Sequence, residues 1–515
     1  MTHGYLFSGS GSNVYVQNLC RALVREGHDV HLLCQEPAPL SYDFVNEHRT
    51  ANAKGTERLG KQETPYPGRC TVYNPEIGDL LPVYVYDDYP RWRVKTFLDL
   101  TDEEFESYVA SNAAALHTVL EASGAKAVVT NHSVPGPLIA RRALSGTGVP
   151  YTSIVHGSCL QYVSRRSAKY MGFTREGLEG ARTILALSSH SAGTIAEDFP
   201  RMKAKTLALP GGVDTDLFRP DALDPGVLKS LNGGPGRGPG QRAALKEALA
   251  DGASGPGELA KKLRGIAVSY DGRSHDADAG TRLEALLDSD APTIIYVGKL
   301  IHSKGVHSLI SAFARIHRAT GARLLIVGYG TFREALEALV HALSAGDHEI
   351  LETLVGRGTL FEGGPDKSLE HFEISEGLLR EAAGVEDFVD FVGPLYHAEL
   401  AKLLPAVDVA VVPSIFPETF GLVAAEFAAS GVVPFVADHS GLREAGEIVG
   451  RGLPFDLRIG MDGFEENLAR ALRGYLALPE EERRRCRKTV RRNSVDHLGW
   501  NTLAEKVAKI AGGED

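Results

Sequence analysis

The sequence predicts an α/β protein built from two Rossmann-like domains, and three observations lead to this class. A chain of 515 residues is longer than one hydrophobic core normally supports, so two domains with additions are expected. Strand-like and helix-like segments alternate in two separate series, which is typical of parallel sheets covered by helices. A stretch rich in glycine and proline, residues 220–292, lies between the two series.

The first series fills residues 1–212. An amphipathic helix is expected at residues 13–26, where Val14, Leu19 and Leu23 share one apolar side. Strands are then expected at residues 29–33, 83–86, 127–130, 152–156, 184–187 and 206–209, and longer helices at 102–122 and 161–179. The first strand is short, because residues 1–7 leave little to bury. We expect either a truncated strand or a protein start that lies upstream.

The second series begins at Thr293 and is expected to form a domain over residues 293–492. Strands are expected at residues 293–297, 323–327, 388–392, 408–413 and 432–437, and helices at 304–318, 331–343 and 420–430. The apolar run at 408–413 has the composition of a strand buried on both faces of a parallel sheet. The sequence alone therefore gives two α/β units.

The remaining segments connect or extend these two domains. Residues 213–292 are expected to form a hinge followed by an insertion. The run GGPGRGPGQ at 233–241 favours a flexible surface excursion over a lid or a subunit contact, because glycine and proline repeats seldom pack. A second insertion is expected at roughly 345–385, and residues 497–511 near the end of the chain are expected to be helical.

The bulk composition argues against several classes of protein. A net charge of −11 and a pI near 5.9 disfavour nonspecific binding of nucleic acid. The longest apolar runs are too short to span a membrane, and the first domain lacks the lysine-rich amphipathic helix expected of a membrane-surface protein. Five scattered cysteines without metal-ligand spacing fit reduced thiols, which favours a cytoplasmic location. The sequence is compatible with a homo-oligomer and does not identify one.

The most informative segment is residues 411–445. Here an apolar strand leads through a turn into a helix that opens at Phe420-Gly421-Leu422. Glu418 and Glu426 stand eight positions apart across this opening, and eight helical residues rise about 12 Å, roughly the length of a sugar-diphosphate-ribose unit. The free N–H groups and positive dipole end of the helix would bind a diphosphate between the two carboxylates. This layout suits a site for a nucleotide sugar.

The run P-E-T-F-G-L-V-A-A-E at 417–426, followed by A-S-G-V-V-P and by S-G-L-R-E at 440–444, resembles the signature of retaining glycosyltransferases of family four, the glycosyl transferases group 1. The resemblance implies the GT-B fold, in which two Rossmann-like domains face each other across a cleft. It implies that residues 493–515 return to the N-terminal domain. It further implies transfer of a hexose, with retention, from a UDP- or GDP-sugar to a hydroxyl acceptor such as a sugar, polyol or small glycoside.

The resemblance assigns most of the donor site to the second domain. Glu418 would hold a hydroxyl of the donor sugar, and Glu426 would accept hydrogen bonds from the ribose. Lys299 and Lys304 would lie on the diphosphate, although Lys299 stands where arginine is usual and lacks its two-pronged geometry. The other donor-binding residues implied are Gly298, Gly328, Leu395, Phe420, Gly421, Leu422 and Val423, largely through backbone groups.

The first domain would contribute a loop and a histidine. Gly9 and Gly11 precede the first helix, where glycine allows close approach to phosphate or sugar. His156, at the end of strand 152–156, matches the histidine that lies near the donor sugar in the family, so it joins Glu418 and the two lysines among the catalytic candidates.

Four residues are candidates for the acceptor side. Asn131 and His132 follow the strand at 127–130. Trp92 and Arg93 lie in the stretch 83–97, which is rich in tyrosine, tryptophan and arginine. Such rings can stack on a sugar, but the same composition also suits an amphipathic sheet edge or a subunit interface, and the sequence favours neither.

No metal or other cofactor is expected beyond the nucleotide sugar itself. Asp-x-Asp occurs at 214–216, 276–278 and 288–290, but only in the hinge or the insertion, and enzymes with this fold typically need no bound metal. Two rival functions stay open. A phosphorylase or synthase that uses phosphate or a sugar phosphate would need a basic pocket, for which Arg141, Arg142, Arg165 and Arg166 are available. A non-catalytic nucleotide-sugar-binding subunit is the rival from another class.

Overall fold

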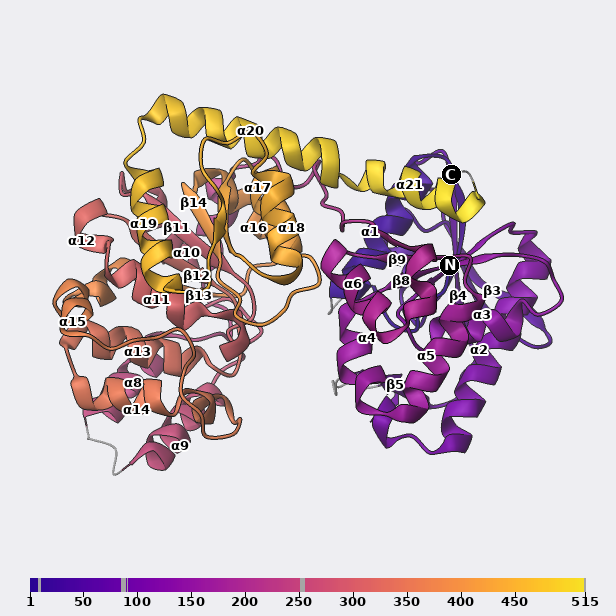
Figure 1. Cartoon of the computed structure of the whole chain (residues 1–515), viewed down its shortest axis with the longest axis horizontal. Helices are drawn as coiled ribbons and strands as arrows, with labels where there is room; N and C mark the ends of the chain where they lie inside the picture. Colours follow the sequence, from indigo (N-terminus) through magenta and orange to yellow (C-terminus); the bar gives the residue numbers. More distant parts are fainter. Residues whose placement is uncertain (8–10, 85–88, 90, 251–254, 514–515) are drawn as a thin grey trace. The chain divides into compact units, whose positions relative to one another are not determined.

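The computed structural model describes residues 1–7, 11–84, 89, 91–250 and 255–513. The chain divides into two compact units, each with its own sheet and helices (Figure 1). Unit 1 is Met1–Gly212 together with Leu498–Asp515, and unit 2 is Val213–His497. The predicted α/β class with two Rossmann-like domains is confirmed.

Unit 1 contains a largely parallel sheet in two halves. One half has the order β1-β4-β2-β3 and the other the order β10-β9-β8-β7. The strands are β1 (Asp29–Leu33), β2 (Glu47–Asn52), β3 (Gly55–Lys61), β4 (Arg69–Pro75), β7 (Val128–Asn131), β8 (Tyr151–Val155), β9 (Thr183–Ala186) and β10 (Thr206–Ala208). Thr2 forms parallel bridges with both Leu33 and Thr130 and thereby joins the halves. In the described part of the chain, the short first strand is reduced to this one residue.

The helices of unit 1 cover this sheet, and their ends follow local sequence signals. The helices are α1 (Gly11–Arg25), α2 (Asp102–Ser123), α3 (Gly136–Ala143), α4 (Gly157–Tyr162), α5 (Ala168–Gly180), α6 (Ser189–Asp198) and α21 (Trp500–Gly512). Thr101 and Glu104 form a capping box at the start of α2, and Gly124 ends that helix in the left-handed region. The C-terminal helix α21 packs on α1, so the end of the chain belongs to unit 1.

Several predictions for unit 1 differ from the structure. Strands β2, β3 and β4 were not predicted, because β2 and β3 are polar and pair antiparallel at the sheet edge without an apolar alternation. The helix predicted at 161–179 is wrong as a single element, since it is divided into α4, a turn at Ser164–Arg166 and α5. Half of the strand predicted at 83–86, residues 85 and 86, lies outside the described residues. A short parallel pair, β5 (Leu80–Val83) and β6 (Arg93–Thr96), occupies that region.

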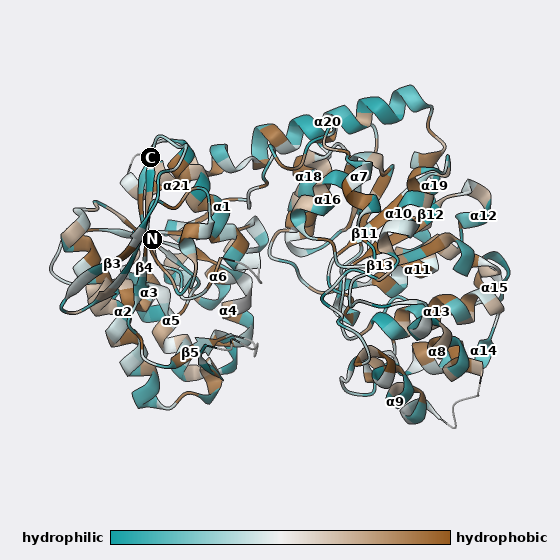
Figure 2. Ribbon diagram, turned by 180° about the vertical axis from the view of Figure 1, so that it is seen from behind, coloured by the Kyte–Doolittle hydropathy of each residue, from teal (hydrophilic) through white to brown (hydrophobic). Residues whose placement is uncertain are grey.

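Unit 2 contains a six-stranded parallel sheet with the order β13-β12-β11-β14-β15-β16. The strands are β11 (Thr293–Val297), β12 (Arg323–Val327), β13 (Val389–Gly393), β14 (Val409–Val412), β15 (Val433–Ala437) and β16 (Arg458–Ile459). In chain order this is 3-2-1-4-5-6, the strand order of a Rossmann fold. The inner strands are strongly apolar, as Figure 2 shows, because helices cover both faces of the sheet.

The helices of unit 2 fall between these strands, within the two insertions and after the last strand. They are α7 (Pro225–Lys229), α8 (Pro239–Ala250), α9 (Pro256–Ala267), α10 (Ala279–Leu287), α11 (Val306–Ala314), α12 (His317–Thr320), α13 (Arg333–Ala345), α14 (His348–Gly356), α15 (Glu376–Ala382), α16 (His397–Leu403), α17 (Leu422–Ala429), α18 (Ser440–Val449), α19 (Phe464–Leu476) and α20 (Glu480–Leu498). The helix predicted at 304–318 starts two residues later, at Val306, and is interrupted between α11 and α12.

The insertion at 220–292 is packed onto the sheet of unit 2, so the predicted flexible excursion is wrong for its described residues. The Arg237 side chain is fully buried and donates to Glu334 at 2.7 Å and to Glu337 at 2.6 Å on α13. Arg333, on α13, donates in turn to both carboxylate oxygens of Asp276 in the insertion, at 2.7 Å each. Buried ions must be paired, and these pairs fix the insertion to α13 despite its glycine-rich sequence.

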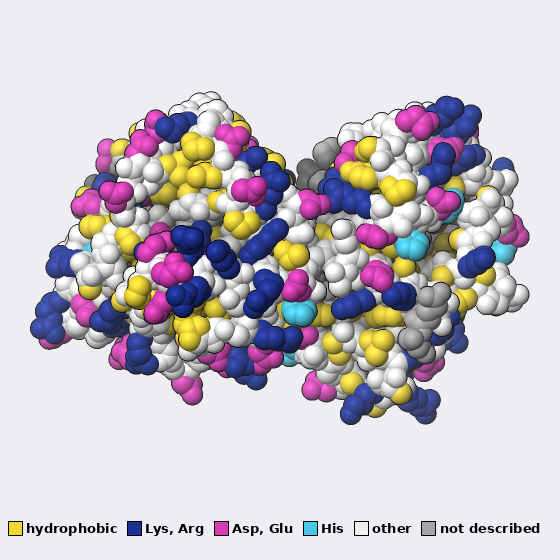
Figure 3. Space-filling view, turned by 90° about the horizontal axis from the view of Figure 1, so that it is seen from above, with side chains coloured by type: hydrophobic (Ala, Val, Ile, Leu, Met, Phe, Trp, Pro, Cys, Tyr) yellow, Lys and Arg dark blue, Asp and Glu magenta, His cyan; other side chains and the backbone are white. Residues whose placement is uncertain are grey.

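Helix α20 carries much of the basic charge of unit 2. Figure 3 shows Lys and Arg side chains gathered along it. Several of these arginines have structural partners. Arg491 donates to the carbonyl oxygens of Thr215, Phe218 and Ala429, and Arg483 pairs with Asp408. Among the helices that the structure describes, none is both long and apolar enough to cross a membrane.

Candidate functional site

The candidate donor residues of unit 2 lie at the centre of its sheet. Strands β11 and β14 are neighbours, with Ile294 paired to Val409, and the chain order reverses between them. Lys299 and Lys304 follow the carboxyl end of β11, and Glu418 follows that of β14. Ligands of open α/β sheets bind at this switch point.

Lys304 and Glu418 form an ion pair, although they are 114 positions apart in the sequence. The Lys304 ammonium donates to Glu418 Oε1, and Ser414 Oγ donates to the same oxygen at 2.9 Å. Both charged side chains are partly exposed, so a ligand can reach them. The loops approach closely because residue 305 is glycine: a Cβ at this position would lie 2.0 Å from the Pro413 carbonyl oxygen.

A network of polar groups positions the Glu418 loop from its other side. The Glu418 backbone N–H donates to Ser440 Oγ at 2.9 Å, and the Gly441 N–H donates to the Glu418 carbonyl at 3.0 Å. The His439 ring lies between Ser440 Oγ, at 2.9 Å, and the Ser414 carbonyl oxygen, at 2.6 Å. The start of α18 therefore holds the loop in place.

Helix α17 begins at Leu422, with Gly421 as its N-cap. The 12 Å spacing estimated from a helical rise does not apply to the two carboxylates, because Glu418 lies in the irregular loop before the helix. Of the side chains that the structure describes, none caps α17, so the first N–H groups, including those of Leu422 and Val423, can bind an anion. Phe420 is buried, and only its backbone is suited to contact a ligand.

Glu426 is paired with a residue that was not among the predicted ones. His397 Nε2 lies 3.2 Å from Glu426 Oε1. The Glu426 carboxylate raises the pKa of His397, so the imidazole is held toward its protonated form. His397 follows the loop Gly393-Pro394-Leu395, and Leu395 is partly exposed there. The predicted ribose acceptor therefore sits next to the predicted base loop.

The predicted glycine loops are in contact with each other. Gly328 has a φ of 154°, and a Cβ there would lie 1.8 Å from the Gly298 carbonyl oxygen, so the loops after β11 and β12 require glycine at this point. Tyr296 Oη donates to the Lys299 carbonyl at 2.8 Å and braces the same turn. The Lys299 side chain is exposed, and no described carboxylate pairs with it.

The candidates in unit 1 lie together at the carboxyl edge of its sheet. His156 Nε2 is 3.2 Å from Asn131 Oδ1, and its ring centroid is 4.8 Å from that of His132. His132 itself has a φ of 71°, an uncommon conformation outside glycine. Gly11 is the first residue of α1, whereas the predicted helix began at residue 13, and Gly9 lies outside the described residues.

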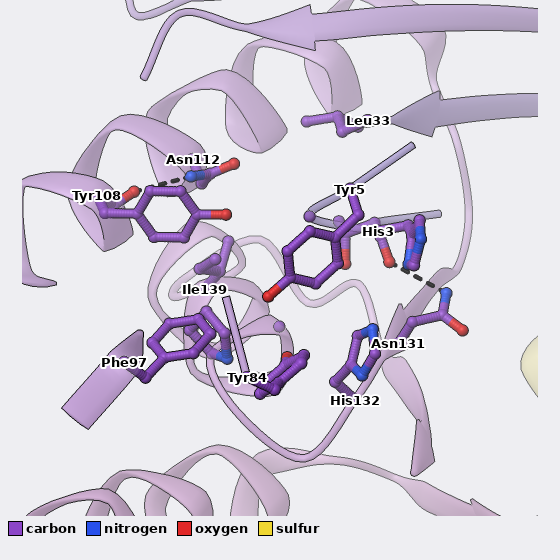
Figure 4. Close-up of a pocket in the computed structure, with 14 residues that line it drawn as sticks. His3, Tyr5, Leu33, Tyr84, Phe97, Tyr108, Asn112, Asn131, His132 and Ile139 are labelled. Atoms are coloured by element: carbon purple, nitrogen blue, oxygen red, sulfur yellow. Dashed lines mark hydrogen bonds between the residues drawn. The ribbon is translucent and has the colours of Figure 1, made fainter. Parts of the chain in front are cut away.

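Asn131 and His132 line a pocket whose other walls were not predicted (Figure 4). The pocket is lined by Thr2, His3, Gly4, Tyr5, Leu33, Tyr84, Phe97, Tyr108, Asn112, Asn131, His132, Pro135, Gly136 and Ile139. Figure 4 shows the rings of Tyr5, Tyr84, Phe97 and Tyr108 around it. These residues come from segments far apart in sequence and none forms a motif, so only the fold reveals them. We call this group the unit 1 pocket.

The histidines at this edge are uncharged near neutral pH. Burial lowers the pKa of His3 to about 4 and that of His156 to about 3, and it holds the pKa of His132 well below its usual range. Three imidazoles in contact thus supply polarity without supplying a positive charge.

Trp92 and Arg93 lie outside the unit 1 pocket. Trp92 packs against the small cluster of Tyr5, Leu81 and Val83, while the Arg93 guanidinium bonds to Asp79 and Glu104 at 3.1 Å each. Their predicted acceptor role stays a prediction.

Three of the four arginines available for a phosphate pocket have partners elsewhere. Arg142 pairs with Glu106, Arg165 pairs with Asp198, and Arg141 donates to the Glu176 carbonyl. None of them, nor Arg166, is among the described residues that line the unit 1 pocket.

Two of the three Asp-x-Asp triplets, at 214–216 and 276–278, have structural partners. Asp276 is bound by Arg333, and Asp278 is bound by Arg242. Asp214 Oδ1 accepts from the backbone N–H groups of Asp216 and Leu217. Within the described ranges, no group of three or more histidine, cysteine or acidic residues has the spacing of a metal site.

Comparison with known families agrees with both units. The Glycosyl transferase 4-like domain matches residues 10–212, and Glycosyl transferases group 1 matches residues 281–351 and 373–493. The gap in the second match falls within the insertion that follows α13.

Curated relatives match shorter parts of the chain. Glycogen synthase of Mycobacterium tuberculosis is 31% identical over 221 residues, which are 42% of this chain and 41% of that protein. D-inositol 3-phosphate glycosyltransferase 2 of Catenulispora acidiphila is 33% identical over 195 residues, covering 37% of this chain and 42% of that protein. The alignments therefore span less than half the length of these relatives.

Solved structures match over nearly the whole chain. Sucrose-phosphate synthase from Thermosynechococcus elongatus has a TM-score of 0.55 at 19% identity and covers 98% of this chain and 94% of its own. HepE of Anabaena in complex with UDP and glucose has a TM-score of 0.54 at 12% identity and covers 100% of both chains. At these identities the likeness shows the fold alone. The two family matches place the chain in the family-four glycosyltransferases, the glycosyl transferases group 1, and the structural likeness gives it the GT-B fold.

Proposed function

We propose that the chain is a retaining hexosyltransferase that takes its sugar from a UDP- or GDP-sugar and transfers it to a hydroxyl acceptor. The observation that carries this proposal is the meeting of Lys304 and Glu418 beside the uncapped start of α17. A cation and free backbone N–H groups suit a diphosphate, and a carboxylate next to them suits a sugar hydroxyl.

Transfer requires stabilisation of the departing nucleoside diphosphate. The bond from sugar C1 to the diphosphate oxygen breaks while the acceptor oxygen bonds to C1, and the departing phosphate oxygen takes the acceptor proton. Lys304 and the α17 N–H groups would stabilise the charge that develops on the diphosphate. When Lys304 turns to the diphosphate, the Glu418 carboxylate is released from its ion pair and can accept from a sugar hydroxyl.

The nucleoside would lie at the same carboxyl edge of the unit 2 sheet, beside Glu426. Glu426 would accept hydrogen bonds from the ribose, next to the base loop at Gly393–Leu395. The nucleotides are proposed from the names of similar proteins: HepE was solved with UDP-glucose, and another relative is a GDP-mannose-dependent mannosyltransferase. His156 in unit 1 would contact the donor sugar, as the family resemblance implies.

A thermal-shift screen against UDP, GDP, ADP and their sugar conjugates tests the proposal. A ligand present at about 100 times its Kd stabilises the folded state by about 2.7 kcal/mol, which raises the melting temperature measurably. We expect UDP or GDP and one of their sugars to produce this shift, and Lys304→Ala to reduce it. If none of these nucleotides shifts the melting temperature, the proposed donor site is wrong.

A further inference from the structure

The turn that carries Lys304 is held by residues that the family match does not cover. The match to Glycosyl transferases group 1 stops at residue 351 and resumes at residue 373. Residues 352–372 belong to the second insertion, the one that follows α13. Their helical turn Gly358–Glu362 lies against the helical turn His302–Lys304. This contact is therefore a feature of the present chain that the family pattern does not include.

One carboxylate of the second insertion accepts a hydrogen bond from the Lys304 turn itself. The backbone N–H of His302, two residues before Lys304, donates to Glu362 Oε2 at 3.0 Å. This N–H lies at the start of a single helical turn, where the helix provides no partner for it. Hydrogen bonds to a charged acceptor are roughly twice as strong as those between neutral groups. Glu362 thus fixes the backbone on the N-terminal side of Lys304.

The same insertion binds the first turn of α11, on the other side of Lys304. His307 Nε2 donates to the carbonyl oxygen of Glu370 at 2.9 Å, and Ser308 Oγ donates to that of His371 at 2.9 Å. The side chains of His307 and Ser308 are fully buried. Because a buried polar group that loses its partner is costly, these bonds keep the insertion against the helix.

The second insertion is packed firmly enough to hold the turn. Phe361, Leu369 and Phe372 are only 3%, 6% and 9% exposed. A Cβ at Gly358 would lie 2.0 Å from Leu369 Cδ2, so the lack of a side chain at residue 358 leaves room for this leucine. The Leu369 N–H also donates to the Val355 carbonyl at 2.8 Å. Apolar burial therefore anchors the segment from which Glu362 reaches the turn.

The turn in its own right holds the loop that carries Glu418. The carbonyl oxygen of Ser303, the residue after His302, accepts hydrogen bonds from three donors of that loop. These are the backbone N–H groups of Ile415 at 3.0 Å and Phe416 at 3.2 Å, and Ser414 Oγ at 3.1 Å. One short turn thus lies between the second insertion and the Glu418 loop, and it carries Lys304.

We propose that Glu362 is a positioning residue for the transfer step, because it fixes the turn from which the Lys304 ammonium reaches the diphosphate. The proposal rests on the proposed function, in which Lys304 leaves Glu418 and turns to the diphosphate. With the backbone held, only the lysine side chain has to move. An error of about 1 Å in the position of a catalytic group can reduce the rate about 100-fold. The second insertion thereby contributes to turnover without contacting the substrate.

Hydrogen–deuterium exchange followed by mass spectrometry tests the hydrogen bond on the full-length protein without nucleotide. Glu362→Ala removes the acceptor, so peptides that contain the His302 N–H should exchange about tenfold faster. Glu362→Gln keeps an oxygen that can accept and should exchange almost as the wild type does. Glu349→Ala is the matched control, because it removes an exposed carboxylate on α14 of the same insertion. Unchanged exchange in Glu362→Ala would overturn the proposal.

Turnover of the same variants tests the positioning role. Release of nucleoside diphosphate from the donor should show kcat about tenfold lower in Glu362→Ala, with a smaller change in KM for the donor. Glu362→Gln should restore most of this loss. In the Lys304→Ala background the same substitution should cost much less, since residues that act through one another are not additive. Equal losses in both backgrounds, or a wild-type kcat in Glu362→Ala, would show that Glu362 does not act through Lys304.

The outcomes separate this proposal from the proposed function. Melting temperatures of the Glu362 variants within a few degrees of the wild type would show that the fold is intact. A wild type that neither binds UDP, GDP or ADP nor releases them from a sugar conjugate would reject the proposed function, while the exchange result would still decide whether Glu362 holds the turn. An active Glu362→Ala with faster exchange would reject the positioning role and leave the proposed function standing.

Discussion

The two candidate sites lie at the same place in their sheets but have opposite chemistry. Each occupies the switch point beside the first strand of its unit. In unit 2 this point carries Lys304, Glu418 and the uncapped start of α17, all charged or dipolar and partly exposed. In unit 1 it carries aromatic rings and neutral imidazoles, with no charged side chain in the described lining. The side chains at the switch point, and not the position itself, therefore decide the chemistry of each site.

Histidine protonation shows the same contrast. In unit 1, burial keeps His3, His132 and His156 neutral. In unit 2, a neighbouring carboxylate holds the pKa of His397 above its usual value. Desolvation dominates in the first case and charge pairing in the second. The following experiments test this difference.

The largest expected effect is loss of unit 1 stability in acid. The folded-state pKa values of His3 and His156 are about 4 and about 3, below the usual 6.5, so the unfolded chain binds more protons. Stability is therefore full above pH 6.5 and falls by up to about 1.4 kcal/mol per pH unit for each such histidine as the pH drops toward 4. Both tryptophans, Trp92 and Trp500, lie in unit 1, so urea unfolding followed by tryptophan fluorescence reports on this unit.

The acid experiment has a direct control. His132→Asn should flatten the dependence between pH 7 and pH 5, because one group that takes up a proton on unfolding is gone. An unfolding midpoint that does not change with pH in the wild type would show that these imidazoles are not held neutral.

The next largest effect is expected for Lys304→Ala. Loss of the ammonium should reduce turnover about 100-fold or more, since a donor aimed at developing charge typically contributes this much. Release of nucleoside diphosphate in a donor-hydrolysis assay measures it. Lys488→Ala, an exposed lysine on α20, is the control and should be unchanged. A near-normal rate for Lys304→Ala would remove this residue from the site.

Glu426→Gln should produce a smaller loss. Hydrogen bonds from ribose to a carboxylate contribute about 1.5 kcal/mol, so nucleotide affinity should fall roughly tenfold in calorimetry. The exposed Glu466 on α19 provides the matched control, Glu466→Gln. Equal affinities in the wild type and Glu426→Gln would contradict the ribose assignment.

The smallest effect concerns the His397–Glu426 pair. The folded-state pKa of His397 is raised, so its contribution to stability is fully present below pH 6.5 and is lost as the pH rises through the raised value. His397 is about half exposed, at 49%, and solvent screening should limit the difference to a few tenths of a kcal/mol. The melting temperatures of the wild type and His397→Gln should differ at pH 6 and converge by pH 9. A difference in melting temperature that grows with pH would contradict the raised pKa of His397.

The sequence by itself determined the alternation of strands and helices in both units. Strands β1, β11 and β12 have the predicted bounds, because an apolar run between turn residues reports burial locally. It also singled out Glu418 and Glu426 as candidates, since a glycine-bounded turn before a helix is visible in a single stretch of residues, and Lys304 as a candidate from a separate turn after a strand. Polar edge strands such as β2 and β3 carry no such signal.

Only the tertiary structure decided which distant residues meet. Arg237 lies in a glycine-rich stretch that predicts flexibility, yet it is buried because α13 presents Glu334 and Glu337 to it. His397 becomes the partner of Glu426, and Tyr5 and His132 become walls of one pocket, by packing across the sheet. Local sequence patterns report backbone preference and burial, whereas pairing, desolvation and the pKa of a side chain depend on neighbours brought near by folding.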